Sequence, residues 1–102
     1  MLDATTVLRK SEHQVSCNLD EEVAILETNS ARYFGLNEVG AHIWRLLDQP
    51  SSVDHICKSV ADHFDVERAA CSDDVLRFLR RMHEAGLIEP VAESRRLGTA
   101  NS

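Results

Sequence analysis

The stretch from Arg32 to Trp44, RYFGLNEVGAHIW, decides the fold because it changes from a strand pattern to a helix pattern within a few residues. Segment 32–36 is short and aromatic, which predicts a strand. Asn37 can then accept hydrogen bonds from the free N–H groups of a helix that begins at Glu38. The apolar residues that recur at helical spacing, and so predict the buried face of this helix, are Val39, Ile43, Leu46 and Leu47.

Two residues inside this helix indicate how it packs. Gly40 costs about 1 kcal/mol of helix stability relative to alanine, so we expect it to mark a place of close packing. Trp44 follows one turn later. We expect Trp44 to be buried and structural, because this helix must pack on the sheet.

Three segments upstream also have strand character. Residues 6–9 and 13–19 are weak candidates; in the second of them Val15, Cys17 and Leu19 alternate with polar residues, the period of a half-buried strand. Residues 23–27, VAILE, form the strongest strand pattern in the chain. The turn-prone residues 28–31 separate this strand from 32–36, which predicts a hairpin.

Two more helices are predicted downstream. After Pro50 ends the first helix, Ser51 or Ser52 can cap a second one, whose apolar stripe is Val53, Ile56, Cys57, Val60, Ala61 and Phe64. The third helix ends before Gly86. It can start at an Asp65 cap or at a Ser72 cap, and we favour the longer version. Its buried face consists of Val75, Phe78, Leu79 and Met82 and closes on Leu87 and Ile88.

Together these elements predict an α+β fold. An N-terminal three-stranded antiparallel sheet covers one side of three helices, a winged helix-turn-helix-like arrangement. We expect one domain over residues 1–90, followed by a polar, disordered tail over 91–102.

Composition excludes several function classes. The chain has 102 residues, 43% hydrophobic and 27% charged, with a formal net charge of −6, which disfavours nucleic acid as a partner. The chain has neither a membrane-spanning run nor an apolar signal core at its start, so we expect a cytoplasmic protein that does not bind membranes. The three cysteines have unpatterned spacing and are expected to be free, small and partly buried.

No pattern in the sequence predicts catalysis. The five histidines lack the i, i+4 spacing of a zinc protease motif, and no glycine-rich phosphate loop is present. The acidic cluster 20–22 has too few oxygen ligands at fixed spacing for a calcium loop. We therefore expect no catalytic residues, no metal and no cofactor.

One basic feature remains on the third helix. Arg77, Arg80 and Arg81 lie at i, i+3 and i+4, opposite the predicted core residues. They form either a solvated face or a rim that meets an acidic partner. A DNA-reading role is the third possibility, but Glu67, Asp73, Asp74 and Glu84 dilute the basic charge of this segment.

The order of these pieces over residues 23–88 resembles the PqqD-like proteins, the precursor-peptide recognition domains of ribosomal peptide natural-product pathways. The resemblance rests on the hairpin ending in Tyr33-Phe34-Gly35-Leu36-Asn37, the helix with Gly40 and Ile43-Trp44, the Ser52-Val53-Asp54 helix start, and the helix from Asp74-Val75 to Gly86-Leu87. The aromatic residues Tyr33, Phe34 and Trp44 look most like the stand-alone versions from lasso-peptide clusters.

The resemblance implies a non-catalytic adaptor that binds the leader segment of a precursor peptide and presents it to a leader peptidase, a cyclase or another modifying enzyme. Family members bind the leader as an added strand, with the last helix as the other wall of the site, and a free strand edge suits that role physically. The residues implied are Ala31, Arg32, Tyr33, Phe34, Gly35, Val75, Phe78, Leu79 and Met82, with Arg77, Arg80 and Arg81 at the rim.

Several points stay open in the sequence. The alternatives to a lasso-type adaptor are a winged-helix DNA-binding regulator, a chaperone of a radical SAM enzyme like PqqD itself, and a structural subunit. Tyr33 and Phe34 are adjacent, so one backbone N–H should face the neighbouring strand and the other the free edge. The sequence does not decide which, nor which side chains face the groove rather than the core.

Overall fold

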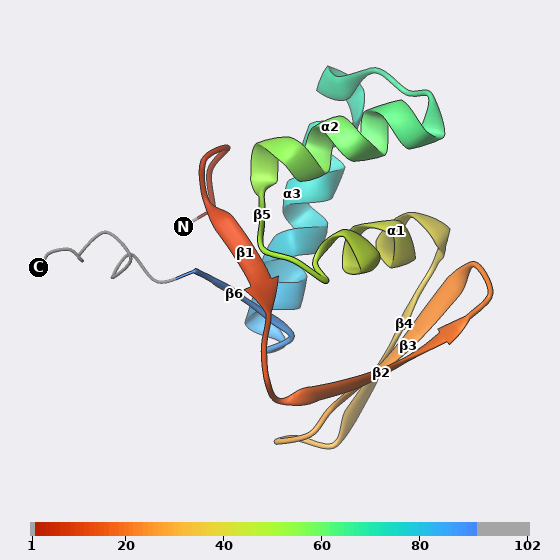
Figure 1. The fold of residues 1–102 in the computed structure, drawn as a ribbon, viewed down its shortest axis with the longest axis vertical. Helices are drawn as coiled ribbons and strands as arrows, with labels where there is room; N and C mark the ends of the chain where they lie inside the picture. The colour runs from red at the N-terminus through yellow and green to blue at the C-terminus, as the bar shows by residue number, and fades with distance from the viewer. Residues whose placement is uncertain (1, 92–102) are drawn as a thin grey trace, which may run out of the picture.

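The computed structural model describes residues 2–91 (Figure 1). The disordered tail predicted for 91–102 lies outside them except for Val91, whose N–H donates to the carbonyl of Val7 at 2.8 Å. The predicted hairpin and the strand before it form one antiparallel sheet in the order β2-β3-β4, made of β2 (Gln14–Leu19), β3 (Glu22–Glu27) and β4 (Arg32–Leu36). The three-stranded sheet is therefore confirmed.

A second small sheet was not predicted. The first strand, β1 (Val7–Lys10), does not join the other three; it pairs with β5 (Ser51–Ser52) on one side and β6 (Ile88–Pro90) on the other. This sheet ties the two ends of the described chain together beside α2 and α3 (Figure 1). Its local sequence signal is weak because β5 and β6 are only two and three residues long.

The three helices follow the predicted order. They are α1 (Glu38–Leu46), α2 (Val53–Phe64) and α3 (Arg68–Glu84). The side chain of Asn37 caps α1 by accepting the N–H of Gly40 at 3.0 Å, and that of Ser52 caps α2 by accepting the N–H of His55 at 3.1 Å. Both satisfy donors that a helix start leaves free.

The start of α3 corrects one expectation. The longer version of the helix is right, but Asp65 is not its cap. Asp65 instead ends α2 in the left-handed conformation, with φ 54°, and α3 begins three residues later after Glu67. At the other end Gly86 has φ 81°, and the N–H groups of Gly86 and Leu87 donate to His83 and Met82, the paired bonds of a glycine-terminated helix.

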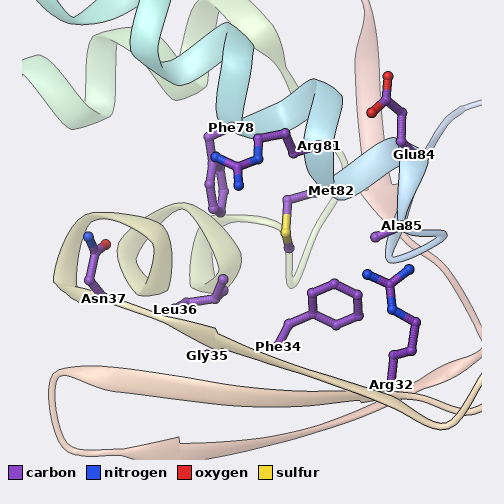
Figure 2. A pocket seen from close by; sticks show the side chains of 10 residues that line it. All are labelled: Arg32, Phe34, Gly35, Leu36, Asn37, Phe78, Arg81, Met82, Glu84 and Ala85. Carbon is purple, nitrogen blue, oxygen red and sulfur yellow. The ribbon is translucent and has the colours of Figure 1, made fainter.

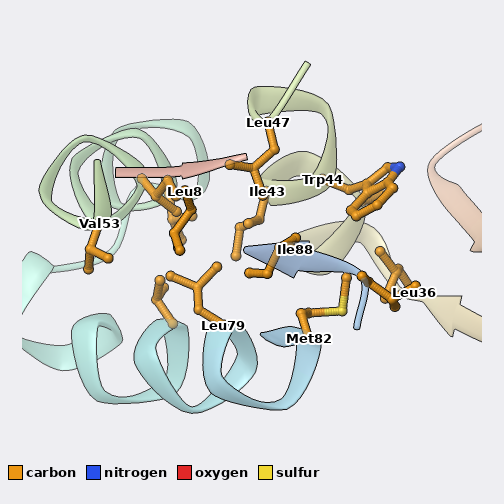
Figure 3. Close-up of a cluster of buried hydrophobic side chains, with 14 of the residues drawn as sticks. Leu8, Leu36, Ile43, Trp44, Leu47, Val53, Leu79, Met82 and Ile88 are labelled. Carbon is orange, nitrogen blue, oxygen red and sulfur yellow. The ribbon is translucent and has the colours of Figure 1, made fainter. Parts of the chain in front are cut away.

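The core lies where the helices meet both sheets (Figure 3). Trp44 is 2% exposed, which confirms that it is buried, and Lys10 Nζ lies 4.5 Å from the centre of its ring. Gly40 also packs closely, as expected: a Cβ there would lie 3.1 Å from the ring of Phe78 and 3.3 Å from the Cβ of Leu36. The residue at this position therefore sets how near α3 comes to α1.

Contacts between α1 and α2 include a pair of histidines. The rings of His42 and His63 stack with centroids 4.3 Å apart, and His42 Nε2 lies 3.0 Å from Ser59 Oγ. Burial lowers the pKa of His42 below its ordinary value, and the neighbouring His63 and Arg45 lower it further. Protonation of His42 is thus disfavoured in the folded state.

Two predicted burial patterns are wrong. In α1, Val39 is 40% exposed, because the buried stripe is shifted to Gly40, Ala41, Ile43, Trp44 and Leu47. In β2, the apolar residues Val15, Cys17 and Leu19 are all exposed, because they lie on the face of the sheet that the described helices do not cover. Of the cysteines, Cys57 is buried and Cys71 half-buried as expected, but Cys17 is exposed.

Candidate functional site

A groove of about 480 Å³ runs between the edge strand β4 and the last helix α3 (Figure 2). Its lower wall comes from β4 and the start of α1, and its upper wall from the C-terminal half of α3. The lining residues are Arg32, Phe34, Gly35, Leu36, Asn37, Phe78, Arg81, Met82, Glu84 and Ala85.

Successive residues of β3 direct their backbone N–H and carbonyl groups alternately to β2 and to β4. Two observations show which residues face which strand. The N–H of Thr28 donates to the carbonyl of His13 at 3.0 Å, so residue 28 faces β2. The two-residue turn at 20–21 is flanked by the pair Leu19 and Glu22, which is the hydrogen-bonded pair of such a hairpin. Even-numbered residues of β3 therefore direct their N–H and carbonyl groups to β2, and odd-numbered ones direct theirs to β4.

This alternation continues into β4. Ile25 and Val23 pair with Phe34 and Leu36, so the backbone groups of Phe34 and Leu36 face inward to β3. Tyr33 and Gly35 then direct their N–H and carbonyl groups to the other side, where β4 has no neighbouring strand within residues 2–91. The edge beside the groove thus offers two donors and two acceptors to an incoming strand.

Side chains of β4 also divide between two faces. Phe34 shares a face with the buried Ile25 and points into the groove, where the guanidinium of Arg32 lies 5.0 Å from its ring centre (Figure 2). Tyr33 pairs with Leu26 on the opposite face and is 77% exposed.

The turn before β4 is held by a buried carboxylate. Glu27 is 5% exposed, and its Oε1 accepts hydrogen bonds from the N–H and the hydroxyl of Ser30 at 2.7 and 2.6 Å. These bonds from Ser30 lower the pKa of Glu27, so the carboxylate stays ionised. Ala31 follows in the left-handed conformation, with φ 59°. The turn ends there, and Arg32 lies at the end of the groove.

The helical wall is apolar in its middle. Phe78 is half-buried against Gly40, and Met82 lies beside Phe34 across the groove (Figure 2). Val75 and Leu79 belong to the same helix, but both are buried in the core and neither lines the groove. A ligand in the groove would therefore meet Phe78 and Met82.

Charge at the groove is mixed. Arg32 and Arg81 both line it, and within the described part of the chain neither forms an ion pair; Glu84 lies at the same end as Ala85. Arg77 instead pairs with Asp74 at 2.9 Å on the solvent side of α3. Arg80 lines a separate hollow with Leu2, His83 and Glu84.

Half of the expected site residues therefore meet in one groove: Arg32, Phe34, Gly35, Phe78, Arg81 and Met82. The other half lie elsewhere: Ala31 in the turn, Tyr33 on the outer face, Val75 and Leu79 in the core, and Arg77 and Arg80 on the far side of α3. Reasoning from sequence missed Leu36, Asn37, Glu84 and Ala85. Leu36 could have been found as the next residue on the Phe34 face, and Ala85 as the residue one turn after Met82.

Two observations within residues 2–91 concern metal and thiol chemistry. No group of three or more His, Cys, Asp and Glu side chains is placed to hold a metal ion. Burial raises the pKa of the Cys57 thiol, with Cys71 a smaller cause, so this thiol is a poor nucleophile. Among the described helices none is long and apolar enough to cross a membrane.

Comparison with known proteins gives the family. The family model described as coenzyme PQQ synthesis protein D (PqqD) matches residues 22–88, most of the chain. The chain belongs to the PqqD family. The matched segment runs from β3 to the start of β6, so it contains both walls of the groove. No curated protein matches the chain significantly.

Solved structures agree with this assignment. TbiB1 in complex with the TbiA(beta) leader peptide is 32% identical with a TM-score of 0.75, over 82% of this chain and 98% of that chain. A lasso peptide synthetase B1 complexed with the leader peptide is 25% identical with a TM-score of 0.69, over 81% and 98%. The PqqD part of Methylobacterium extorquens PqqCD, a stand-alone recognition element, is 18% identical with a TM-score of 0.71, over 87% and 95%, and shows the shared fold.

These matches confirm the PqqD-like resemblance. They also confirm the likeness to the lasso-peptide versions, since both lasso-type proteins are more similar in sequence than PqqD is.

Proposed function

We propose that this chain is a non-catalytic adaptor that binds the leader segment of a ribosomally made precursor peptide and presents it to a processing enzyme. The observation that carries this proposal is the free edge of β4 beside the groove. Tyr33 and Gly35 direct their backbone groups outward there, and an extended peptide can add to them as a fourth strand.

The groove also favours a certain leader chemistry. Its middle is formed by Phe34, Phe78 and Met82, which suit an apolar or aromatic side chain of the added strand. Arg32 and Arg81 flank this apolar middle, so a leader with carboxylates on either side of an apolar residue is favoured by charge. The two similar lasso-type proteins are each complexed with a leader peptide, which supports a leader peptide as the ligand.

The alternatives have less support. Duplex DNA would require a basic surface, whereas the chain has a net charge of −6. A chaperone role beside a radical SAM enzyme would use the same peptide site, but the chain is more similar to the lasso-type proteins. A leader peptidase or cyclase remains the processing partner proposed here, and the cytoplasm is the expected place of action.

The test is an anisotropy titration with a fluorescein-labelled leader peptide, taken from a candidate precursor that a short open reading frame beside the gene would encode. Arg32→Glu/Arg81→Glu should weaken binding about tenfold or more, because two cations are reversed in the groove. The matched control Arg77→Glu/Arg80→Glu changes net charge equally on the same protein and should weaken binding much less. Equal losses for both pairs, or tighter binding of duplex DNA than of the leader, would contradict the proposal.

A further inference from the structure

Asn37 stands where the free edge of β4 ends and α1 begins. The residue is exposed and lines the groove, while its Oδ1 caps α1 by accepting the N–H of Gly40 at 3.0 Å. Figure 2 shows Asn37 at one end of the groove and Arg32 and Ala85 at the other. The residue that starts the helix therefore also belongs to the peptide site.

Capping determines which atoms of Asn37 a ligand can meet. An asparagine side chain has one acceptor oxygen and two N–H donors on Nδ2. Because the oxygen accepts the N–H of Gly40, Nδ2 is turned away from the N–H groups of the first helical turn. Within residues 2–91 no group accepts a hydrogen bond from Nδ2. Two donors are thus available to a ligand at this end of the groove.

The backbone edge of β4 cannot be followed past Gly35. Tyr33 and Gly35 direct their N–H and carbonyl groups to the free edge, and Asn37 is the next residue in this alternation. The carbonyl of Asn37, however, accepts the N–H of Ala41 at 2.7 Å in the first turn of α1. An added strand finds no free backbone acceptor there, but it does find the donors on Nδ2. A peptide that leaves β4 at this point should therefore present an oxygen to Asn37.

Charge at this end of the groove also favours an oxygen acceptor. The start of α1 carries the positive end of the helix dipole, and Arg81 lines the groove with its guanidinium above α1 in the view of Figure 2. Glu38 opposes this charge from the first turn of α1, but it does not line the groove. The lining carboxylate of the described chain, that of Glu84, lies at the other end. The Asn37 end is therefore the better place for a partly or fully negative oxygen.

We propose that Asn37 is a specificity-determining residue of the peptide site, and that its Nδ2 donates to an oxygen of the leader where the added strand leaves β4. This inference rests on the proposed function and deepens it. The contact limits strand addition to the stretch opposite Tyr33 and Gly35, and it fixes the register of the leader along the edge. The accepting oxygen belongs either to the leader backbone or to an acidic side chain of the leader.

The test uses variants that keep the helix cap but remove the two amide donors. Aspartate and serine cap helices about as well as asparagine does, so Asn37→Asp and Asn37→Ser should both retain the start of α1. The matched control is Ser52→Asp, which puts the same carboxylate at the cap of α2, outside the groove. Leader affinity is measured by anisotropy with the fluorescein-labelled leader peptide, and stability by a circular dichroism melt.

We expect both Asn37 variants to melt within about 2 °C of the wild type and to bind the leader about fivefold more weakly or worse. Asn37→Asp should lose more than Asn37→Ser, because its carboxylate also repels the leader oxygen, whereas Ser52→Asp should bind like the wild type. In nitrogen-15 spectra, the side-chain amide signals that Asn37→Asp removes should shift when the leader is added to the wild-type chain. Unchanged affinity of the Asn37 variants, an equal loss in the control, or unshifted amide signals would overturn the inference.

Leader variants identify the accepting oxygen. Each aspartate or glutamate of the leader is replaced in turn by asparagine or glutamine. If the loss caused by Asn37→Asp shrinks for one of these leaders, that carboxylate is the acceptor; if the loss persists for all of them, a backbone carbonyl is, and either result supports the contact. Failure of the wild-type chain to bind the leader at all would instead refute the proposed function, and the inference with it.

Discussion

Proline substitutions in β4 test the assigned direction of its backbone. Because Tyr33 directs its N–H to the free edge and Phe34 directs its N–H to β3, proline should have opposite effects at these neighbouring positions. Proline removes the N–H and is tolerated at an edge where that group faces outward. The residue before each proline already lies in a strand, so the restriction that proline imposes on it costs little in either variant.

Magnitudes follow from the single N–H that is lost. In Phe34→Pro, a carbonyl of β3 loses its partner, which costs about 1–3 kcal/mol of unfolding free energy beyond Phe34→Ala and lowers the melting temperature by about 4 °C or more. In Tyr33→Pro the N–H that is removed faces the free edge, so a carbonyl of the bound leader loses its partner instead. Leader affinity should drop about 5- to 150-fold relative to Tyr33→Ala, with a melting temperature close to that control.

The assay pairs a circular dichroism melt with a leader titration for all four variants. If Tyr33→Pro unfolds the protein while Phe34→Pro melts like its alanine control, the backbone direction assigned to β4 is wrong. If both proline variants fold and bind the leader like their controls, the leader does not add to this edge. Amide exchange that slows on leader binding only in the helices would also show that the leader binds elsewhere.

Three further predictions concern the scaffold. Trp44→Ala should cost about 3–5 kcal/mol, a large part of the roughly 5–15 kcal/mol that stabilises a small domain, and an unchanged urea midpoint would contradict its place in the core. Gly40→Val should cost about 1–3 kcal/mol of unfolding free energy through overpacking against Phe78. It should also weaken leader binding, because the Phe78 ring must move within the groove. A variant with wild-type leader affinity would show that leader binding does not depend on the position of the Phe78 ring. His42 has a folded pKa below its ordinary value of 6.5, so the unfolded chain binds more protons and stability should fall as the pH drops from about 7.5 to about 5.5. His42→Gln should flatten that dependence in melts across this range, whereas the exposed control His83→Gln should not.

Local patterns in the sequence determined most of the secondary structure. Strand β4, the Asn37 cap and helix α1 follow from interactions within a few residues, as do the Ser52 cap and the end of α3 at Gly86. The family resemblance also came from such segments in their order along the chain. The burial of Trp44 could be predicted as well, since α1 had no other way to pack on the sheet.

Only the tertiary structure decided which side of each element meets a neighbour. A strand pattern states that apolar residues alternate, but it does not state which face the helices cover, so Val15 and Leu19 were expected inside and lie outside. The arginines of α3 share one helix face in sequence, yet only Arg81 lines the groove, because the side of α3 that meets the groove carries Phe78, Arg81 and Met82. The second sheet joins residues about 80 positions apart, and no local pattern records such a pairing. The sequence by itself thus determined the elements and their order, whereas packing between distant segments determined the groove, its free edge and the exposed sheet face.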